Sequence, residues 1–264
     1  MSNDQPYPNG RAVLSAIKEK AVAAHRSGLG TSVQSLIELA IFDRFLCRMF
    51  SAPDCPLGDH LEFRYLRHRD TGGRNQPELQ AAAVAFSVTV RGAGTQNPIN
   101  VDLAIHKRTP AAPLERITPA FRLDMSRLGP VADYQAIAVE DQIADKVCAT
   151  LSMFGGQPST RSKDLVDLAI LTRTMPINAK QLRISVHTEA LHRHLPTFTS
   201  IAVPRSMTDG YSKVARTVLL LGDILNSDAA ILVVNAMLQP ALSGDFMEGR
   251  WDPTHQRWVG VTDS

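Results

Sequence analysis

The first fifty residues carry apolar side chains at helical spacing. Three of them recur every four positions: Val13, Ile17 and Ala21. Asn9 can cap this helix, which is expected to end near Arg26 because Gly28 and Gly30 follow. A second stripe, capped by Thr31 or Ser32, contains Ile37, Ile41, Phe45 and Met49. The pattern predicts two helices that bury these stripes against each other or against a sheet.

The spacing then changes to strict alternation, which indicates half-buried strands. Alternating segments are 61–67 (LEFRYLR), 83–91 and 99–106 (INVDLAIH). Because the turns are short, we expect an antiparallel meander with one face on the helices. In the third strand Asp102 lies on the polar side. A short strand is expected near 114–117, within a proline-rich and otherwise irregular segment.

From Glu140 onward the spacing of apolar residues is helical almost to the end. We expect a helix that ends at Gly155-Gly156, a second capped by Ser159 or Thr160, and a third opened by Asn178. Two more are expected over 210–222 and 227–242, before a polar tail, RWDPTHQRWVG. The sequence therefore predicts an α+β fold: an α+β domain over 1–135 and a helical C-terminal domain over 136–264.

Composition and charge exclude several classes of protein. The net charge of +2 is too small to indicate a nucleic-acid binder, so any such surface must be a local patch. No apolar run reaches the length of a membrane span, and the N-terminus lacks a signal-peptide pattern. Cys47, Cys55 and Cys148 stand at no metal-binding spacing, and the first and last fall in apolar helical patterns. We expect a cytoplasmic protein without a membrane partner.

Two charged residues in regular elements are candidates for chemistry. Asp102, fixed by a sheet, could hold a divalent metal, or it could simply lie on a solvated strand face. Lys146 could pair with nucleotide phosphates, or it could pair with Asp141 or Gln142 on its own helix. The spacing alone leaves both alternatives open.

A second group of charged residues lies on the two following helices. Asp164 and Asp167 share a helix face near its N-terminus, where the helix dipole alone would favour them. Lys180, Arg183 and His187 form a basic stripe, suited to phosphate contacts or to solvent. The histidines at 187, 192 and 194 have no convincing zinc-ligand spacing.

The runs VEDQIADKVCATL and RSKDLVDLAIL resemble the C-terminal signature of the AbiEii/AbiGii-type nucleotidyltransferase toxins, including their MenT-like branch. The N-terminal helix pair, LGDHLEFRYLRHR and INVDLAI match further parts of that family in order, so the resemblance covers most of the chain. It implies a polymerase-β-like nucleotidyltransferase domain followed by an α-helical domain.

The resemblance also implies a function and a set of site residues. Such a toxin, restrained by a cognate antitoxin, uses Mg²⁺ to transfer nucleotides from an NTP to RNA. The tRNA 3′ acceptor end is the expected target, and translation is then blocked. Asp102 resembles a metal-binding carboxylate of the later strand. Lys146 resembles the lysine expected at the triphosphate, and Asp164 resembles the catalytic-site aspartate, with Asp167 close behind. Lys163 is a further candidate for binding the nucleotide. The basic stripe of Lys180, Arg183 and His187 predicts RNA binding from its charge pattern, independently of the resemblance.

One departure from the family concerns the junction between residues 51 and 60. The glycine-rich turn and D-x-D strand of the family belong there, yet the sequence contains no D-x-D or D-x-E at any position. Three explanations are open: a stretch is missing from the sequence at this junction, the deletion is genuine, or another segment supplies the metal ligands. The alternative function is a catalytically inactive relative that binds RNA or an antitoxin.

Overall fold

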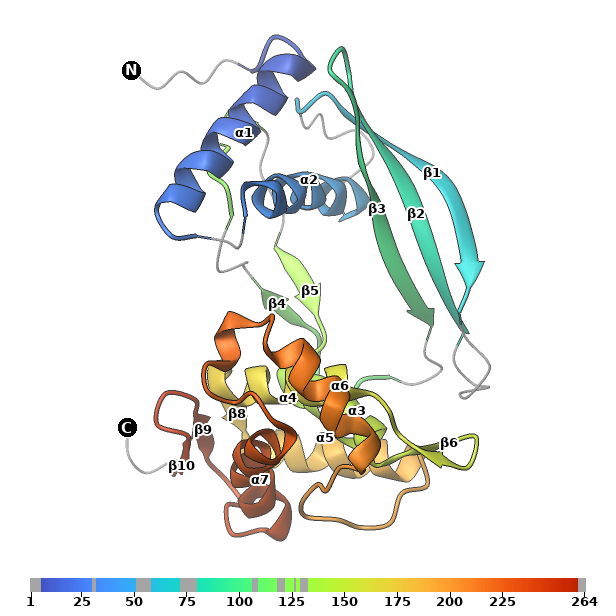
Figure 1. Cartoon of the computed structure of the whole chain (residues 1–264), viewed down its shortest axis with the longest axis vertical. Coiled ribbons are helices and arrows are strands. Elements are labelled where there is room, and N and C mark those ends of the chain that lie inside the picture. The colour runs from blue at the N-terminus through green and yellow to red at the C-terminus, as the bar shows by residue number, and fades with distance from the viewer. Residues whose placement is uncertain are drawn as a thin grey trace. The chain divides into compact units, whose positions relative to one another are not determined.

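The computed structural model describes residues 6–29, 32–50, 58–71, 80–105, 109–117, 122–125, 127–128 and 133–260. The chain forms two compact units (Figure 1). Unit 1 contains Met1–Lys107 and Arg116–Gln135, and unit 2 contains Arg108–Glu115 and Ala136–Ser264. Cys55 and most of the junction discussed above fall in 51–57, outside the described residues. None of the described helices is long and apolar enough to cross a membrane.

Unit 1 begins with two helices, α1 (Gly10–Arg26) and α2 (Val33–Phe50). The Asn9 side chain accepts a hydrogen bond from Ala12 N, which confirms the predicted cap. The α1 stripe is buried against Leu36 and Ala40 of α2. The prediction that Met49 belongs to the buried stripe of α2 was wrong, because this residue is 60% exposed. A four-residue spacing drifts about 40° per step around a helix, which turns Met49 about 120° away from Ile37.

Three strands form the sheet of unit 1: β1 (Leu61–Asp70), β2 (Gln80–Val90) and β3 (Gly94–Ile105). They pair antiparallel in the order β1-β2-β3, which confirms the meander. Figure 1 shows α1 and α2 on one side of this sheet. On that side Phe45 of α2 contacts the rings of Phe63 and Phe86. The pairing of β1 with β2 shifts register between Tyr65 and Arg67.

The strand expected near 114–117 is β4 (Glu115–Ile117), and it pairs with β5 (Tyr134–Ala136). Both strands lie where the chain passes from one unit to the other. The fold therefore has the mixed helix and strand content of an α+β protein.

Unit 2 is mainly helical and has its own core. Its helices are α3 (Val139–Leu151), α4 (Ser162–Thr174), α5 (Ala179–His192), α6 (Thr208–Ala215) and α7 (Ser227–Ser243), with 3-10 turns η1 (Arg205–Met207) and η2 (Leu219–Leu221). Asn178 accepts from Gln181 N and caps α5 as predicted. The predicted cap of α4 was wrong, because Arg161 precedes it without a side-chain cap. The helix expected over 210–222 was also wrong in extent, since α6 ends at Ala215.

Two short hairpins complete unit 2. In the first, β6 (Met153–Phe154) and β7 (Gln157–Pro158) flank two glycines with positive φ, so Phe154 leaves the helix predicted for it. In the second, β9 (Arg250–Asp252) and β10 (Arg257–Val259) pair beside β8 (Ile177–Asn178). This second hairpin was predicted as a polar tail, but Trp251 and Trp258 are buried and donate to backbone carbonyls of α4 and α7.

A buried ion pair ties the segment before β1 to α2. The side chain of Asp59 has no exposed area, and its oxygens lie 3.0 Å from Arg44 Nε and 2.6 Å from Arg48 Nη2. Leu61 N also donates to Asp59, at 3.1 Å. Arg44 is itself buried, and the Asp59 carboxylate compensates part of its charge.

Asp59→Asn should therefore lower the free energy of unfolding by about 3–5 kcal/mol, because it removes the buried negative charge that Arg44 and Arg48 share. Urea unfolding measures this loss. Asp124→Asn is the matched control, since its 3.8 Å pair with Lys20 is exposed and should contribute about 0–1 kcal/mol. Equal effects of the two substitutions would contradict the structural role of Asp59.

Candidate nucleotide site on α3 and α4

Packing of α3 against α4 brings together three of the residues predicted for the site. Lys146 Nζ lies 2.6 Å from Asp167 Oδ2 and 3.7 Å from Asp164 Oδ1. The opposite faces of both helices lie in the core of unit 2, where Val147 and Leu165 have no exposed area. The core therefore fixes the separation of the lysine from the two carboxylates.

Asp164 is the most buried charged residue of this cluster. Its side chain is 12% exposed, and Arg161 Nε lies 2.8 Å from Oδ2. Burial raises the pKa of Asp164, and the charges of Arg161 and Lys146 offset part of that rise. A carboxyl with a raised pKa beside two cations can exchange a proton nearer to neutral pH than a free aspartate. Arg161 was missed by the sequence analysis, although it stands three residues before Asp164.

A second ion-pair network lies next to the first. Arg193, the residue that follows α5, pairs with Asp145 of α3 and, at 2.5 Å, with Glu189 of α5. This arrangement holds the end of α5 against α3. Asp167 is 46% exposed, compared with 21% for Lys146, so it is the partner that an incoming anion could most easily replace. Lys163 is exposed on α4, next to Asp164 in the sequence.

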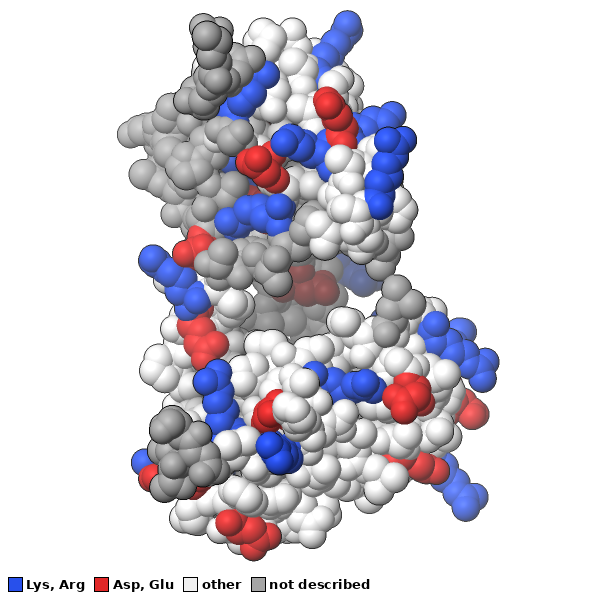
Figure 2. Space-filling view, turned by 90° about the vertical axis from the view of Figure 1, so that its left-hand side faces the viewer, with Lys and Arg blue, Asp and Glu red and all other residues white. Residues whose placement is uncertain are grey.

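The basic stripe on α5 contains residues with different structural surroundings. Lys180 and His187 are exposed. Arg183 instead donates to the backbone oxygens of Ala241, Phe246 and Met247, at 3.2–3.5 Å, and so satisfies carbonyls at the end of α7 and beyond it. An RNA-binding role for the stripe remains a prediction. On the face drawn in Figure 2, basic and acidic side chains are interspersed, so a basic surface has to be local.

Asp102 belongs to unit 1 and lies exposed on β3, opposite Ala83 of β2. The register places it on the sheet face that turns away from α2. Within the described residues, no three His, Cys, Asp or Glu side chains lie close enough together to hold a metal ion.

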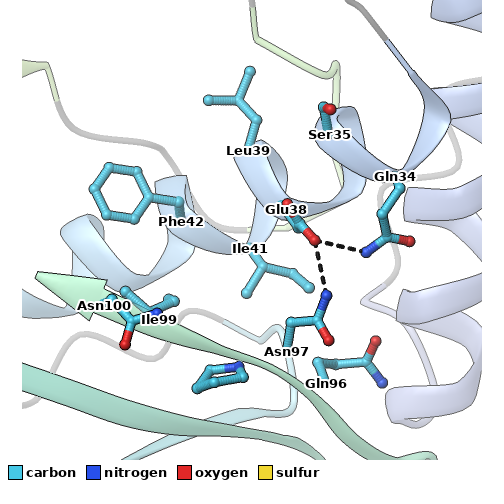
Figure 3. A pocket seen from close by; sticks show the side chains of 11 residues that line it. Gln34, Ser35, Glu38, Leu39, Ile41, Phe42, Gln96, Asn97, Ile99 and Asn100 are labelled. Atoms are coloured by element: carbon cyan, nitrogen blue, oxygen red, sulfur yellow. Dashed lines mark hydrogen bonds between the residues drawn. The ribbon is translucent and has the colours of Figure 1, made fainter. Parts of the chain in front are cut away.

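Unit 1 also contains a cavity of about 590 Å³ between α2 and β3 (Figure 3). Glu38 lies in its wall and accepts hydrogen bonds from Gln34 Nε2 and Asn97 Nδ2, both at 2.9 Å. These bonds lower the pKa of Glu38. The cavity is lined by none of the residues that the sequence analysis assigned to the site.

Comparison with known proteins decides which family the chain represents. The model of the family described as "Nucleotidyl transferase AbiEii toxin, Type IV TA system" matches residues 58–231, two thirds of the chain. The chain belongs to the AbiEii nucleotidyltransferase toxin family. This confirms the resemblance seen in the sequence, and the matched segment contains Asp102, Lys146, Asp164 and Asp167. The match begins at residue 58, after most of the junction where the D-x-D segment is lacking.

Among solved structures, the chain is similar to MenT4, a nucleotidyltransferase toxin from Mycobacterium tuberculosis H37Rv. The two are 14% identical over 78% of this chain and 74% of that one, with a TM-score of 0.35. No curated protein matches the sequence.

Lys146→Met should reduce the free energy of unfolding at pH 7 by about 1–2 kcal/mol. Without this cation the pKa of Asp164 in the folded state rises further, so keeping the ionised carboxylate buried costs more. Below that pKa the carboxyl is neutral and the cost disappears. The loss should therefore shrink as the pH falls towards 4. Urea unfolding at several pH values measures it, with Lys213→Met on an exposed part of α6 as control. A loss that does not change with pH would contradict this coupling.

Arg183→Ala should destabilise the protein by about 1–3 kcal/mol, because three carbonyl oxygens lose a charged donor. Lys180→Ala, one turn earlier and exposed, should change stability by less than about 0.5 kcal/mol. Thermal unfolding compares the two variants. Similar melting temperatures would show that Arg183 is not needed at the end of α7.

Proposed function

We propose that this chain is the toxin-side protein of a toxin–antitoxin pair that binds a nucleoside triphosphate and RNA without completing nucleotide transfer by itself. Family membership supports the toxin assignment and implies an antitoxin partner. The binding part rests on Lys146, which can exchange the exposed carboxylate of Asp167 for a phosphate oxygen. Lys163, which is exposed on α4 next to Asp164 in the sequence, would add a second cation for the triphosphate.

The proposal that the chain does not complete nucleotide transfer rests on its shortage of metal-binding carboxylates. Two-metal phosphoryl chemistry requires carboxylates that converge on the same pair of ions. Asp102 is the carboxylate that the resemblance assigns to Mg²⁺, and the sequence has no D-x-D to accompany it. The described residues contain no cluster of three metal-binding side chains. This set does not fit the Mg²⁺ centre that the family implies, so no step is assigned to a metal.

A second candidate function is the full family reaction. In it, Mg²⁺-dependent transfer adds nucleotides from an NTP to the 3′ acceptor end of tRNA and so blocks translation. Two observations favour it: the family match covers all four predicted catalytic residues, and Asp164 has the raised pKa that suits a proton-transferring group. Residues outside the described part of the chain would then have to provide the missing ligands.

Incubation of the whole chain with each labelled NTP, Mg²⁺ and total tRNA separates the two candidates. We expect no label on tRNA, together with a tRNA mobility shift that weakens as salt rises. Lys180→Glu should weaken this shift if the α5 stripe contacts RNA, and it leaves the Arg183 contacts intact.

Label on tRNA would contradict the binding-only proposal. If that label disappeared in Lys146→Ala, Asp164→Ala and Asp102→Asn, all of them still folded, the full family reaction would be supported instead. Absence of both label and shift would contradict both candidates.

A further inference from the structure

The register shift in β1 gathers arginines on one face of the unit 1 sheet. Arg64 lies opposite Ser87 of β2, whereas Arg67 and Arg69 lie opposite Ala85 and Ala83. All three partners are odd-numbered residues of one strand, so they share a face. The bulge therefore places Arg64, Arg67 and Arg69 side by side, although 64 and 67 would lie on opposite faces of a regular strand.

This face is the one that turns away from the helices. The opposite face carries Leu61, Phe63 and Val88, which pack with Ile41 of α2. Without the register shift, Leu66 and His68 would have followed Arg64, and the other two arginines would have turned toward the α2 side. The bulge leaves Leu66 unpaired and 53% exposed, which is unfavourable for a residue of this type. Bulges often re-aim side chains at functional positions.

The neighbouring strand leaves room beside the arginines. Ala81, Ala83 and Ala85 of β2 lie on the same face, so no long side chain stands between β1 and β3. The arginines are exposed, and Arg64 shares the carboxylate of Glu62 with Arg91 at the end of the row. Residues two apart on a strand are separated by about 7 Å, so the guanidinium groups form a linear row of positive charge.

We propose that this arginine strip, formed by Arg64, Arg67 and Arg69 over the alanines of β2, binds the phosphodiester backbone of RNA. The choice of RNA as the ligand rests on the proposed function. The new element is an RNA-contact surface in unit 1, in addition to the residues of unit 2. A linear row of cations matches a linear polyanion, and guanidinium groups bind phosphate oxygens in a bidentate manner. On β3, Asp102 and Asn100 lie opposite Ala83 and Ala85 of β2, so the cationic surface is limited to the β1 side.

The test is fluorescence anisotropy of the whole chain with labelled tRNA at several salt concentrations. Arg67→Gln/Arg69→Gln should weaken binding about tenfold or more and reduce the slope of log K against log salt by about 1.4–1.8. The control, Lys18→Gln/Arg26→Gln, removes the same charge from exposed positions of α1 and should leave the slope nearly unchanged. Ala83→Glu and Ala83→Gln place side chains of equal size on the alanine surface beside the arginines. Only the negatively charged glutamate should abolish binding.

The outcomes distinguish this inference from the proposed function. If the wild type binds tRNA and the Arg67→Gln/Arg69→Gln variant, with normal thermal unfolding, binds it equally well, the arginine strip is not the RNA-binding surface. That result would contradict this inference and leave the proposed RNA binding intact. No binding of tRNA by the wild type would overturn both. Binding of polyglutamate in place of tRNA would overturn the inference in favour of an acidic protein partner.

Discussion

The contact of Lys146 with Asp164 and Asp167 is the interaction on which the candidate chemistry of this protein depends. Asp164 is buried at the start of α4, and its ionised form needs the two cations nearby. The same lysine is one of the two cations, with Lys163, that we propose to bind a triphosphate. A nucleotide would therefore compete with Asp167 for Lys146, and phosphate binding and the charge state of Asp164 are coupled.

Phosphate-binding sites are proposed in both units, although the net charge is only +2. One is the Lys146 site in unit 2, and another is the row of arginines that a β-bulge brings onto one face of unit 1. At the Lys146 site two carboxylates, Asp164 and Asp167, pair with cations, and within the described residues no third acidic, histidine or cysteine side chain joins them to form a metal-binding group.

Periodicity predicted most regular elements because one face of each is buried in one of the units. Helix caps at Asn9 and Asn178 were correct since their side chains act locally. The hairpin of Trp251 and Trp258 was missed because strands of three residues are too short for a periodic signal. The pairing of Lys146 with Asp164 and Asp167, the use of Arg183 at the end of α7 and the bulge at Leu66 all depend on packing between elements, which spacing along the chain cannot reveal.

The central claim is that Lys146 binds a triphosphate without help from a protein-held metal. Calorimetric titration of the whole chain with non-hydrolysable analogues of the four NTPs tests it most directly, in EDTA and in Mg²⁺. The account predicts that at least one analogue binds in EDTA and that Lys146→Met weakens it by about tenfold or more, while Lys213→Met does not. Binding that requires Mg²⁺ and is unaffected by Lys146→Met would contradict the account.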